Sequence, residues 1–230
     1  DFLRARAIRF IIATNNSARP SSEIVGRLAR FGITITENQV LTSAEAPALY
    51  LPRVIARGAR VFLVGGEGIA NELTRAGFQL VEENAEAVVV GLDTNLTYQK
   101  LKRAALEIRR GAKFVGTNAD KTYPTEEGLV PGSGPIIAAL ETATDVAPII
   151  IGKPERALFD IAIEKLAAPR ECVAMLGDRL DTDIEGAQRA GLRSILVFTG
   201  VATRASLEHS DIQPDFIAEN LDALREMWSR

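Results

Sequence analysis

Apolar runs of strand length alternate with segments of helical period along nearly the whole 230-residue chain. Such alternation is typical of a parallel β-sheet with helices packed on its faces. The expected strands are residues 8–13, 61–64, 87–90, 113–116, 149–151, 172–176, 194–198 and 215–218. The expected helices are residues 20–31, 42–57, a segment that ends at residue 76, and then residues 97–110, 135–142, 154–166, 182–190 and 220–228.

Several expected boundaries carry their own signals. Pro20 lies in the first turn of one helix, where its missing N–H costs nothing. Thr42 and Glu45 have the T-x-x-E spacing of a capping box and predict a helix that Gly58 ends. The segment 117–134 is rich in Gly and Pro and is expected to be a loop.

Composition and charge narrow the class of protein. Hydrophobic residues make up 47% and charged residues 25%, which supports a buried core and excludes disorder or a collagen-like repeat. The net charge of −3 offers no basic stripe for nucleic acid or an anionic membrane. Apolar stretches such as 148–151 are far shorter than the roughly 20 residues that span a bilayer. We therefore expect a soluble, cytoplasmic protein without nucleic-acid or membrane partners.

The chain has one cysteine and one histidine. Cys172 cannot form an internal disulfide or a cysteine-rich zinc site, and its apolar surroundings predict that it packs in a strand of a protein from a reducing compartment. His209 lies in a polar stretch, and any triad or histidine-ligated metal would depend on it alone. A solvated loop position is the expectation for His209.

Polar residues follow three expected strands directly, where ligands bind in open α/β sheets. Thr14, Asn15 and Asn16 offer hydroxyl and amide donors ahead of a helix, which suits an anionic oxygen. Lys153 follows the second strand, and an acidic loop with Asp178 follows the third. Donors, one cation and carboxylates together indicate a phosphate group held beside a hard ion such as Mg²⁺.

Each of these patterns also has a plainer explanation. Two successive asparagines commonly form a turn and a helix cap, and the segments 152–154 and 177–183 could simply start helices. Their joint placement after three separate strands favours a binding site. The segment 65–68 lacks the G-x-G-x-x-G spacing of a dinucleotide loop, so a tight turn is the preferred explanation there.

With these segments in order, the chain resembles the haloacid dehalogenase superfamily of phosphatases. The resemblance is to the subfamily of p-nitrophenyl phosphatase, phosphoglycolate phosphatase and pyridoxal phosphatase, and it covers essentially all 230 residues. It implies a Rossmann-like parallel-sheet core with an inserted α/β cap. The core would comprise residues 1–59 and 149–230, and the cap residues 60–148. The matching segments are residues 14–17, 117–120, 123–124, 128–132, 152–154 and 177–184.

The resemblance also implies roles for single residues. Thr14 would donate a hydrogen bond to the transferring phosphoryl group, Asn15 and Asn16 would add contacts, and Lys153 would neutralise charge on that group and on the nucleophile.

The acidic loop and the cap have implied roles too. Asp178 would ligate Mg²⁺, and Asp183 would orient the metal shell or Lys153. The loop 118–124 would close over the leaving group with Tyr123 facing the substrate, although Tyr123 could instead cover the cap core.

One motif of the family is not found among the 230 residues. The family's nucleophile and acid/base lie in D-x-D-G-x-[TV] after the first strand, whereas the D-x-D spacing at 181–183 belongs to the acidic loop. The chain opens on Asp1, and residues 2–7 resemble the last turns of a helix. We therefore expect the first core strand, with the nucleophile, to precede Asp1, unless it has been lost naturally.

The resulting hypothesis is a Mg²⁺-dependent phosphatase that hydrolyses a small phosphorylated metabolite through an aspartyl-phosphate. The 230-residue chain itself is then expected to be inactive. The alternative is a non-catalytic phosphate-binding or regulatory module. A cofactor-dependent oxidoreductase or a methyltransferase would rest on residues 65–68 and fold analogy alone. Similar proteins commonly dimerise through the cap, but no apolar stripe marks such an interface.

Overall fold

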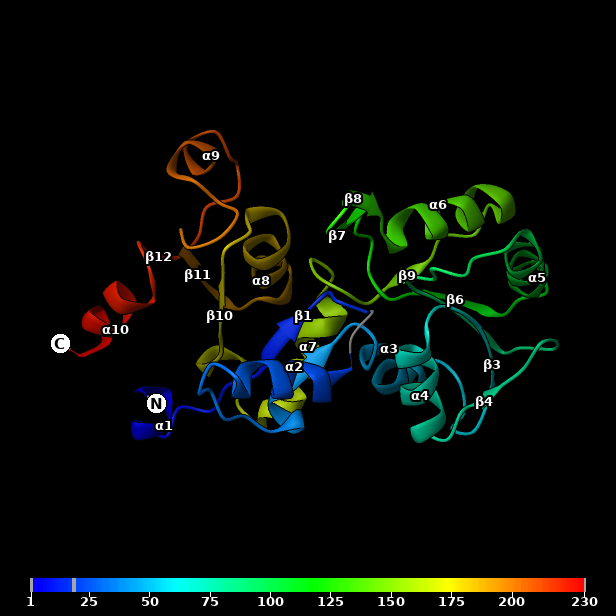
Figure 1. Cartoon of the computed structure of the whole chain (residues 1–230), viewed down its shortest axis with the longest axis horizontal. Helices are drawn as coiled ribbons and strands as arrows, with labels where there is room; N and C mark the ends of the chain where they lie inside the picture. The colour runs from blue at the N-terminus through cyan, green and yellow to red at the C-terminus, as the bar shows by residue number, and fades with distance from the viewer. Residues whose placement is uncertain (1, 18–19, 230) are drawn as a thin grey trace. The chain divides into compact units, whose positions relative to one another are not determined.

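The computed structural model describes residues 2–17 and 20–229 and divides into two compact units (Figure 1). The central unit comprises Ile12–Gly152, and the terminal unit comprises Asp1–Ile11 with Lys153–Arg230. Each unit is a part of the chain that packs mainly against itself. The expected core and cap are a different division of the chain, and that division remains a prediction. The expected α/β class with parallel sheets is confirmed.

The central unit contains a five-stranded parallel sheet in the order β4-β3-β5-β6-β9. Val61 on β3 pairs with Ala87 on β5, and Val88 on β5 pairs with Phe114 on β6. The strands are β3 (Arg60–Val64), β4 (Gln79–Leu80), β5 (Ala87–Val90), β6 (Lys113–Gly116) and β9 (Ile149–Ile150). The helices that follow them are α4 (Glu67–Arg75), α5 (Tyr98–Arg109) and α6 (Ser133–Thr144).

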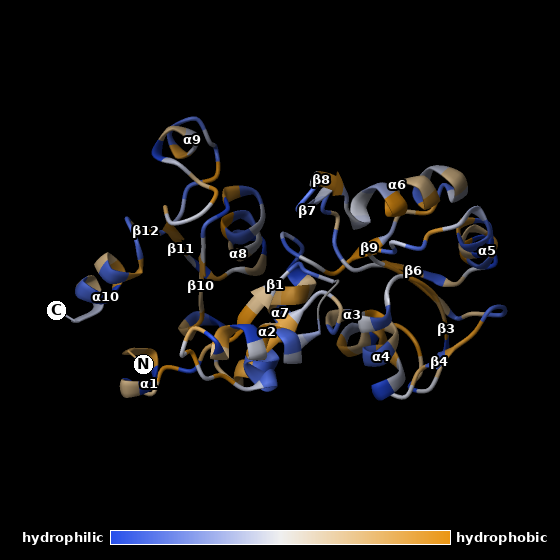
Figure 2. Cartoon of the chain, viewed as in Figure 1, coloured by the Kyte–Doolittle hydropathy of each residue, from blue (hydrophilic) through white to orange (hydrophobic). Residues whose placement is uncertain are grey.

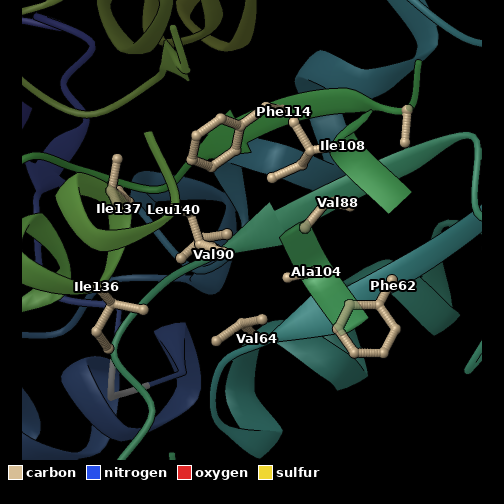
Figure 3. Packing of buried hydrophobic residues seen from close by; sticks show 11 residues of the cluster. Phe62, Val64, Val88, Val90, Ala104, Ile108, Phe114, Ile136, Ile137 and Leu140 are labelled. Carbon is tan, nitrogen blue, oxygen red and sulfur yellow. The ribbon is translucent and has the colours of Figure 1, made fainter. Parts of the chain in front are cut away.

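The core of this sheet lies against α5 and α6 (Figure 3). Side chains from β3, β5 and β6 point toward one face, where Ile108 and Leu140 of the two helices meet them. In Figure 2 the strands are coloured hydrophobic, whereas α5 carries hydrophilic residues as well. Burial of one apolar stripe per helix is the main stabilising contribution here.

A second parallel pair in the central unit precedes this sheet. Strand β1 (Ile12–Thr14) pairs with β2 (Val40–Thr42), and α2 (Ser21–Ala29) and the 3₁₀ turn η1 (Glu37–Gln39) lie between them in sequence. The expected helix 42–57 is wrong, because β2 ends at its first residue. The Thr42 hydroxyl does accept the Glu45 N–H at 3.1 Å, but only α3 (Ala46–Tyr50) and the 3₁₀ turn η2 (Leu51–Arg53) follow. Pro52 has no N–H to continue the helix.

The terminal unit contains a three-stranded parallel sheet in the order β10-β11-β12. Phe159 and Ala187 belong to one buried cluster, and Ile184, Leu196 and Ala202 to another. The strands are β10 (Ala174–Gly177), β11 (Arg193–Val197) and β12 (Phe216–Ala218). The helices are α1 (Phe2–Ala5), α7 (Arg156–Leu166), α8 (Glu185–Ala190), α9 (Arg204–Glu208) and α10 (Leu221–Ser229), with a π-helical turn η4 at Leu180–Ile184.

The two ends of the described chain meet within the terminal unit. Phe2 of α1 stacks on Trp228 of α10 with 6.4 Å between ring centroids. The Arg6 guanidinium donates a hydrogen bond to the Trp228 carbonyl at 2.9 Å and lies over the Phe2 ring. These contacts fasten α1 to α10.

Three local expectations need correction. Cys172 does not pack in a strand: it is exposed at the end of the 3₁₀ turn η3 (Arg170–Cys172), which Pro169 precedes. His209 is exposed as expected, but it caps α9 and its Nδ1 lies 2.8 Å from the Ala205 carbonyl oxygen. The segment 117–134 contains an antiparallel hairpin, β7 (Thr122–Thr125) with β8 (Gly128–Pro131). β-forming residues flank the turn at residues 126–127, and Gly128 at φ 122° allows the chain to enter β8.

Among the described residues, no helix combines the length and apolar character that a membrane span needs.

Asp215 ties β11 to the start of β12. Its Oδ2 accepts the Ser194 N–H at 2.9 Å and the Ser194 hydroxyl at 3.0 Å, and Oδ1 accepts from the Arg193 guanidinium at 2.9 Å. The hydrogen bond from the Ser194 N–H, followed by those from Arg193 and the Ser194 hydroxyl, holds the pKa of Asp215 below its ordinary value.

We therefore expect Asp215→Asn to lower the free energy of unfolding by about 1 kcal/mol at neutral pH, because a neutral acceptor replaces a charged one. A depressed carboxyl pKa contributes stability above the unfolded-state pKa of about 3.9, and this contribution is lost as the pH falls through the lower folded-state value. Urea unfolding at several pH values should show the wild type and the variant converging below about pH 4. The exposed Asp211→Asn is the control, and a gap that persists at low pH would contradict the argument.

Candidate functional site

The loop after β1 holds a first group of candidate residues, in the central unit. Thr14 ends the strand, and its hydroxyl oxygen accepts the Asn16 N–H at 3.2 Å. The Thr14 carbonyl oxygen accepts the Ser43 N–H at 3.0 Å, which continues the parallel pairing beyond β2. Thr14, Asn15 and Asn16 are partly buried, and Ser17 is buried. The expected donor loop is therefore an ordered strand exit.

Asn15 is held through both its side chain and its backbone. Its side-chain nitrogen donates to Asp120 Oδ1 at 3.0 Å, and its carbonyl oxygen accepts from Asn118 Nδ2 at 2.8 Å and from the Ser43 hydroxyl. Gly152, the residue before Lys153, lies so near that a Cβ there would be 2.9 Å from Asn15 Oδ1 and 2.7 Å from the Thr117 carbonyl oxygen. Only glycine fits at this position without displacing its neighbours.

Lys153 and Asp183 form a second group of candidate residues, in the terminal unit. Lys153 Nζ lies 2.7 Å from Asp183 Oδ1, and the two side chains are only 12% and 5% exposed. Asp183 Oδ2 accepts the N–H groups of Asp178 and Arg179, each at 3.2 Å. A buried ion pair is stable only when further hydrogen bonds satisfy its remaining atoms, and Asp183 meets that condition.

Asp178 follows β10 directly and is held by the loop after β11. Its Oδ2 accepts the Val201 N–H at 2.8 Å, and its carbonyl oxygen accepts the Ala202 N–H at 2.8 Å. A Cβ at Gly200 would overlap the same carboxylate oxygen. The hydrogen bond from the Val201 N–H therefore fixes Oδ2 of Asp178, and no hydrogen bond joins Oδ1 to the described residues.

The donor chemistry fits a hard cation held mainly by its substrate and water. The described residues contain no group of three or more His, Cys, Asp or Glu side chains that could hold a metal ion. Mg²⁺ commonly binds through one or two carboxylates, waters and substrate phosphate oxygens. Asp178 Oδ1 suits that mode, whereas Asp183 is occupied by Lys153 and two backbone N–H groups.

The two aspartates with D-x-D spacing differ in environment. Asp181 is exposed and pairs with the exposed Arg179, 3.0 Å away, whereas Asp183 is buried. The π-helical turn η4 turns one carboxylate to solvent and the other toward Lys153.

The remaining site expectations stay predictions. Tyr123 is partly buried on β7 opposite Val130, and its contact with a substrate is untested. Thr14 lies in the central unit, whereas Lys153 and Asp178 lie in the terminal unit, so their meeting around one pocket also remains a prediction.

Sequence reasoning missed Ser43 and Gly200 as supports of the site. Ser43 follows the short strand β2, and the rule that polar residues at strand exits serve sites would have found it had Val40–Thr42 been predicted as a strand. Gly200 contributes only the absence of a side chain, which no residue-type search detects.

The chain is similar to known proteins along most of its length. A haloacid dehalogenase-like hydrolase model matches residues 1–79, and a HAD-hydrolase-like model matches residues 150–224. An acid sugar phosphatase from Staphylococcus haemolyticus is 39% identical over 223 residues, which are 96% of this chain and 84% of that protein.

Solved structures extend the comparison. A p-nitrophenyl phosphatase from Archaeoglobus fulgidus has a TM-score of 0.92 and 31% identity, over 98% of this chain and 88% of that one. A glycerol phosphate phosphatase from Mycobacterium tuberculosis, solved in complex with magnesium, has a TM-score of 0.86 and 41% identity, over 94% of this chain and 67% of that one. These similarities extend over both compact units.

Proposed function

The chain belongs to the haloacid dehalogenase-like hydrolases, and from that membership we propose that it is a Mg²⁺-dependent phosphatase of small phosphomonoesters. Sugar phosphates and glycerol phosphate are the substrate class, because the similar proteins are named for them.

The observation that carries this proposal is the buried chain of contacts from Lys153 through Asp183 to the backbone of Asp178. These contacts hold the ammonium group of Lys153 and the carboxylate of Asp183 in fixed positions within the terminal unit. Groups fixed before the substrate arrives can counter charge on a phosphoryl group without paying for reorganisation during the reaction.

Each residue has a distinct part in the proposed reaction. Lys153 neutralises negative charge on the phosphoryl oxygens, and the Thr14 hydroxyl donates a hydrogen bond to one of them, with Asn15 and Asn16 as further donors. Asp178 holds Mg²⁺, which when bound supplies positive charge to the same oxygens. Asp183 holds Lys153 in place.

The proposed nucleophile is an aspartate carboxylate of the family's D-x-D-G-x-[TV] motif, which the 230 residues do not contain. It attacks phosphorus, the ester oxygen leaves with a proton from the second aspartate, and water then hydrolyses the aspartyl-phosphate. In this proposal the 230 residues supply groups that counter charge, and the attacking carboxylate belongs to that motif.

Turnover of p-nitrophenyl phosphate tests both parts of this proposal. The 230-residue chain should show no Mg²⁺-dependent turnover, and fusing a strand that carries the D-x-D-G-x-[TV] motif ahead of residue 1 should produce it. Within the fused chain, Asp178→Asn or Lys153→Met should abolish turnover, whereas the exposed Asp211→Asn should leave it unchanged.

Two outcomes would contradict the proposal. Turnover by the 230-residue chain that Asp178→Asn abolishes would place the nucleophile within it. A fused chain that binds inorganic phosphate but never turns over would favour the non-catalytic binding module instead.

We further propose a cytoplasmic location, which is supported by a single exposed cysteine with no partner for a disulfide in the sequence. We also propose the division into a core of residues 1–59 and 149–230 and a cap of residues 60–148, with Tyr123 on the cap facing the substrate. Dimerisation through that cap remains a prediction, which the molar mass in solution would test.

A further inference from the structure

Three loops of the central unit meet at one asparagine. The loop after β1 contributes Asn15, the loop after β2 contributes Ser43, and the loop after β6 contributes Asn118 and Asp120. Asn15 and Asp120 are 105 positions apart in sequence, so only the fold brings them together. These four residues are called the Asn15 clamp below.

The clamp holds both ends of the Asn15 residue. Ser43 is fully buried and Asn118 is 2% exposed, and both donate to the Asn15 carbonyl oxygen. Asp120 accepts from the Asn15 side-chain nitrogen. With its backbone and its side chain both bonded, Asn15 cannot rotate without breaking partly buried hydrogen bonds, which are costly to leave unmade.

Asn118 also fixes Asp120. Its Oδ1 accepts the Asp120 N–H at 3.1 Å while its Nδ2 serves Asn15, so a single buried carboxamide joins the two loops. The Asp120 carbonyl oxygen accepts the Gly134 N–H at 2.9 Å, in the first turn of α6. The start of α6 and the loop after β1 are therefore both bonded to Asp120.

We propose that Asp120 is a positioning residue that orders the loop Thr14–Asn16 for phosphate binding and couples this loop to the start of α6. The inference rests on the proposed phosphatase function. In it, Asp120 contacts the loop Thr14–Asn16 and not the substrate. A loop that is ordered beforehand avoids the entropic cost of ordering when the anion binds, so loss of the clamp weakens binding.

The test uses inorganic phosphate titrated into the 230-residue chain by calorimetry. Asp120→Ala should weaken phosphate binding by about tenfold, since a hydrogen bond to a charged group is lost. Asp120→Asn should recover most of the affinity, because its side-chain oxygen can still accept from Asn15. Glu127→Ala removes an exposed carboxylate from the turn of the nearby β7–β8 hairpin, and it should leave phosphate binding unchanged.

Hydrogen–deuterium exchange separates positioning from general stability. Asp120→Ala should speed exchange in residues 14–17 and leave the buried strand β5 at the wild-type rate. The inference is overturned if phosphate affinity and exchange in residues 14–17 both stay at wild-type values, or if exchange in β5 rises equally. If the wild-type chain binds no phosphate, the proposed function fails, and the exchange comparison alone decides the role of Asp120.

Discussion

Replacing Asp183 by alanine is expected to lower the free energy of unfolding by about 3–5 kcal/mol, the cost of breaking a buried ion pair by removing one partner. Asp183 is the acceptor for Lys153 Nζ at 2.7 Å and for the N–H groups of Asp178 and Arg179. Its removal leaves a mostly buried ammonium and two backbone donors without that acceptor. Urea unfolding of the variant and the wild type measures the difference.

Asp181→Ala provides a matched control on the same π-helical turn. Asp181 and its partner Arg179 have side chains that are 65% and 47% exposed, so the loss of this pair should cost well under 1 kcal/mol. If both substitutions lower the free energy of unfolding equally, the buried Lys153–Asp183 pair stabilises the protein no more than the exposed Arg179–Asp181 pair does. Asp183→Asn should fall between them, because one side-chain oxygen can still accept.

Replacing Gly200 by alanine is expected to weaken Mg²⁺ binding by about 10- to 100-fold, the usual range for residues that orient a metal ligand. A Cβ at Gly200 would occupy the position of Asp178 Oδ2 and break the hydrogen bond from the Val201 N–H. The carboxylate proposed as the magnesium ligand would then have to turn.

Calorimetric titration of Mg²⁺ measures this effect without relying on turnover. Gly26→Ala is the control, because a Cβ at Gly26 has no neighbour within 4 Å and should leave Mg²⁺ binding unchanged. Wild-type affinity in Gly200→Ala would contradict the view that the loop after β11 holds Asp178 in place.

Much of the fold was predictable because parallel strands are uniformly apolar and end in polar residues. Val88 and Val89 lie in a fully buried strand at the expected position. The short strand β2 escaped prediction because three residues carry no periodicity and Thr42 also has the spacing of a helix cap. The hairpin β7–β8 was hidden by Gly and Pro, which occur in turns and in the strands beside them alike.

The candidate site was predictable only as a set of residue types at strand exits. That rule selected Asn15, Lys153 and Asp178, each of which the structure holds by hydrogen bonds or an ion pair. The partners that hold them come from distant positions, as Asp120 does for Asn15, and pairing over such separations leaves no local pattern. Backbone supports such as the Val201 N–H carry no side-chain signal at all.

Because Phe2 stacks on Trp228, the fluorescence of Trp228 is sensitive to this contact. Trp228 is the only tryptophan of the chain, so selectively excited fluorescence reports on the contact of α1 with α10 and thus on the terminal unit alone. Far-ultraviolet circular dichroism, in contrast, averages over helices of both units. If the two signals change at different urea concentrations, the units melt separately, and the effect of Asp183→Ala can be attributed to the unit that contains it.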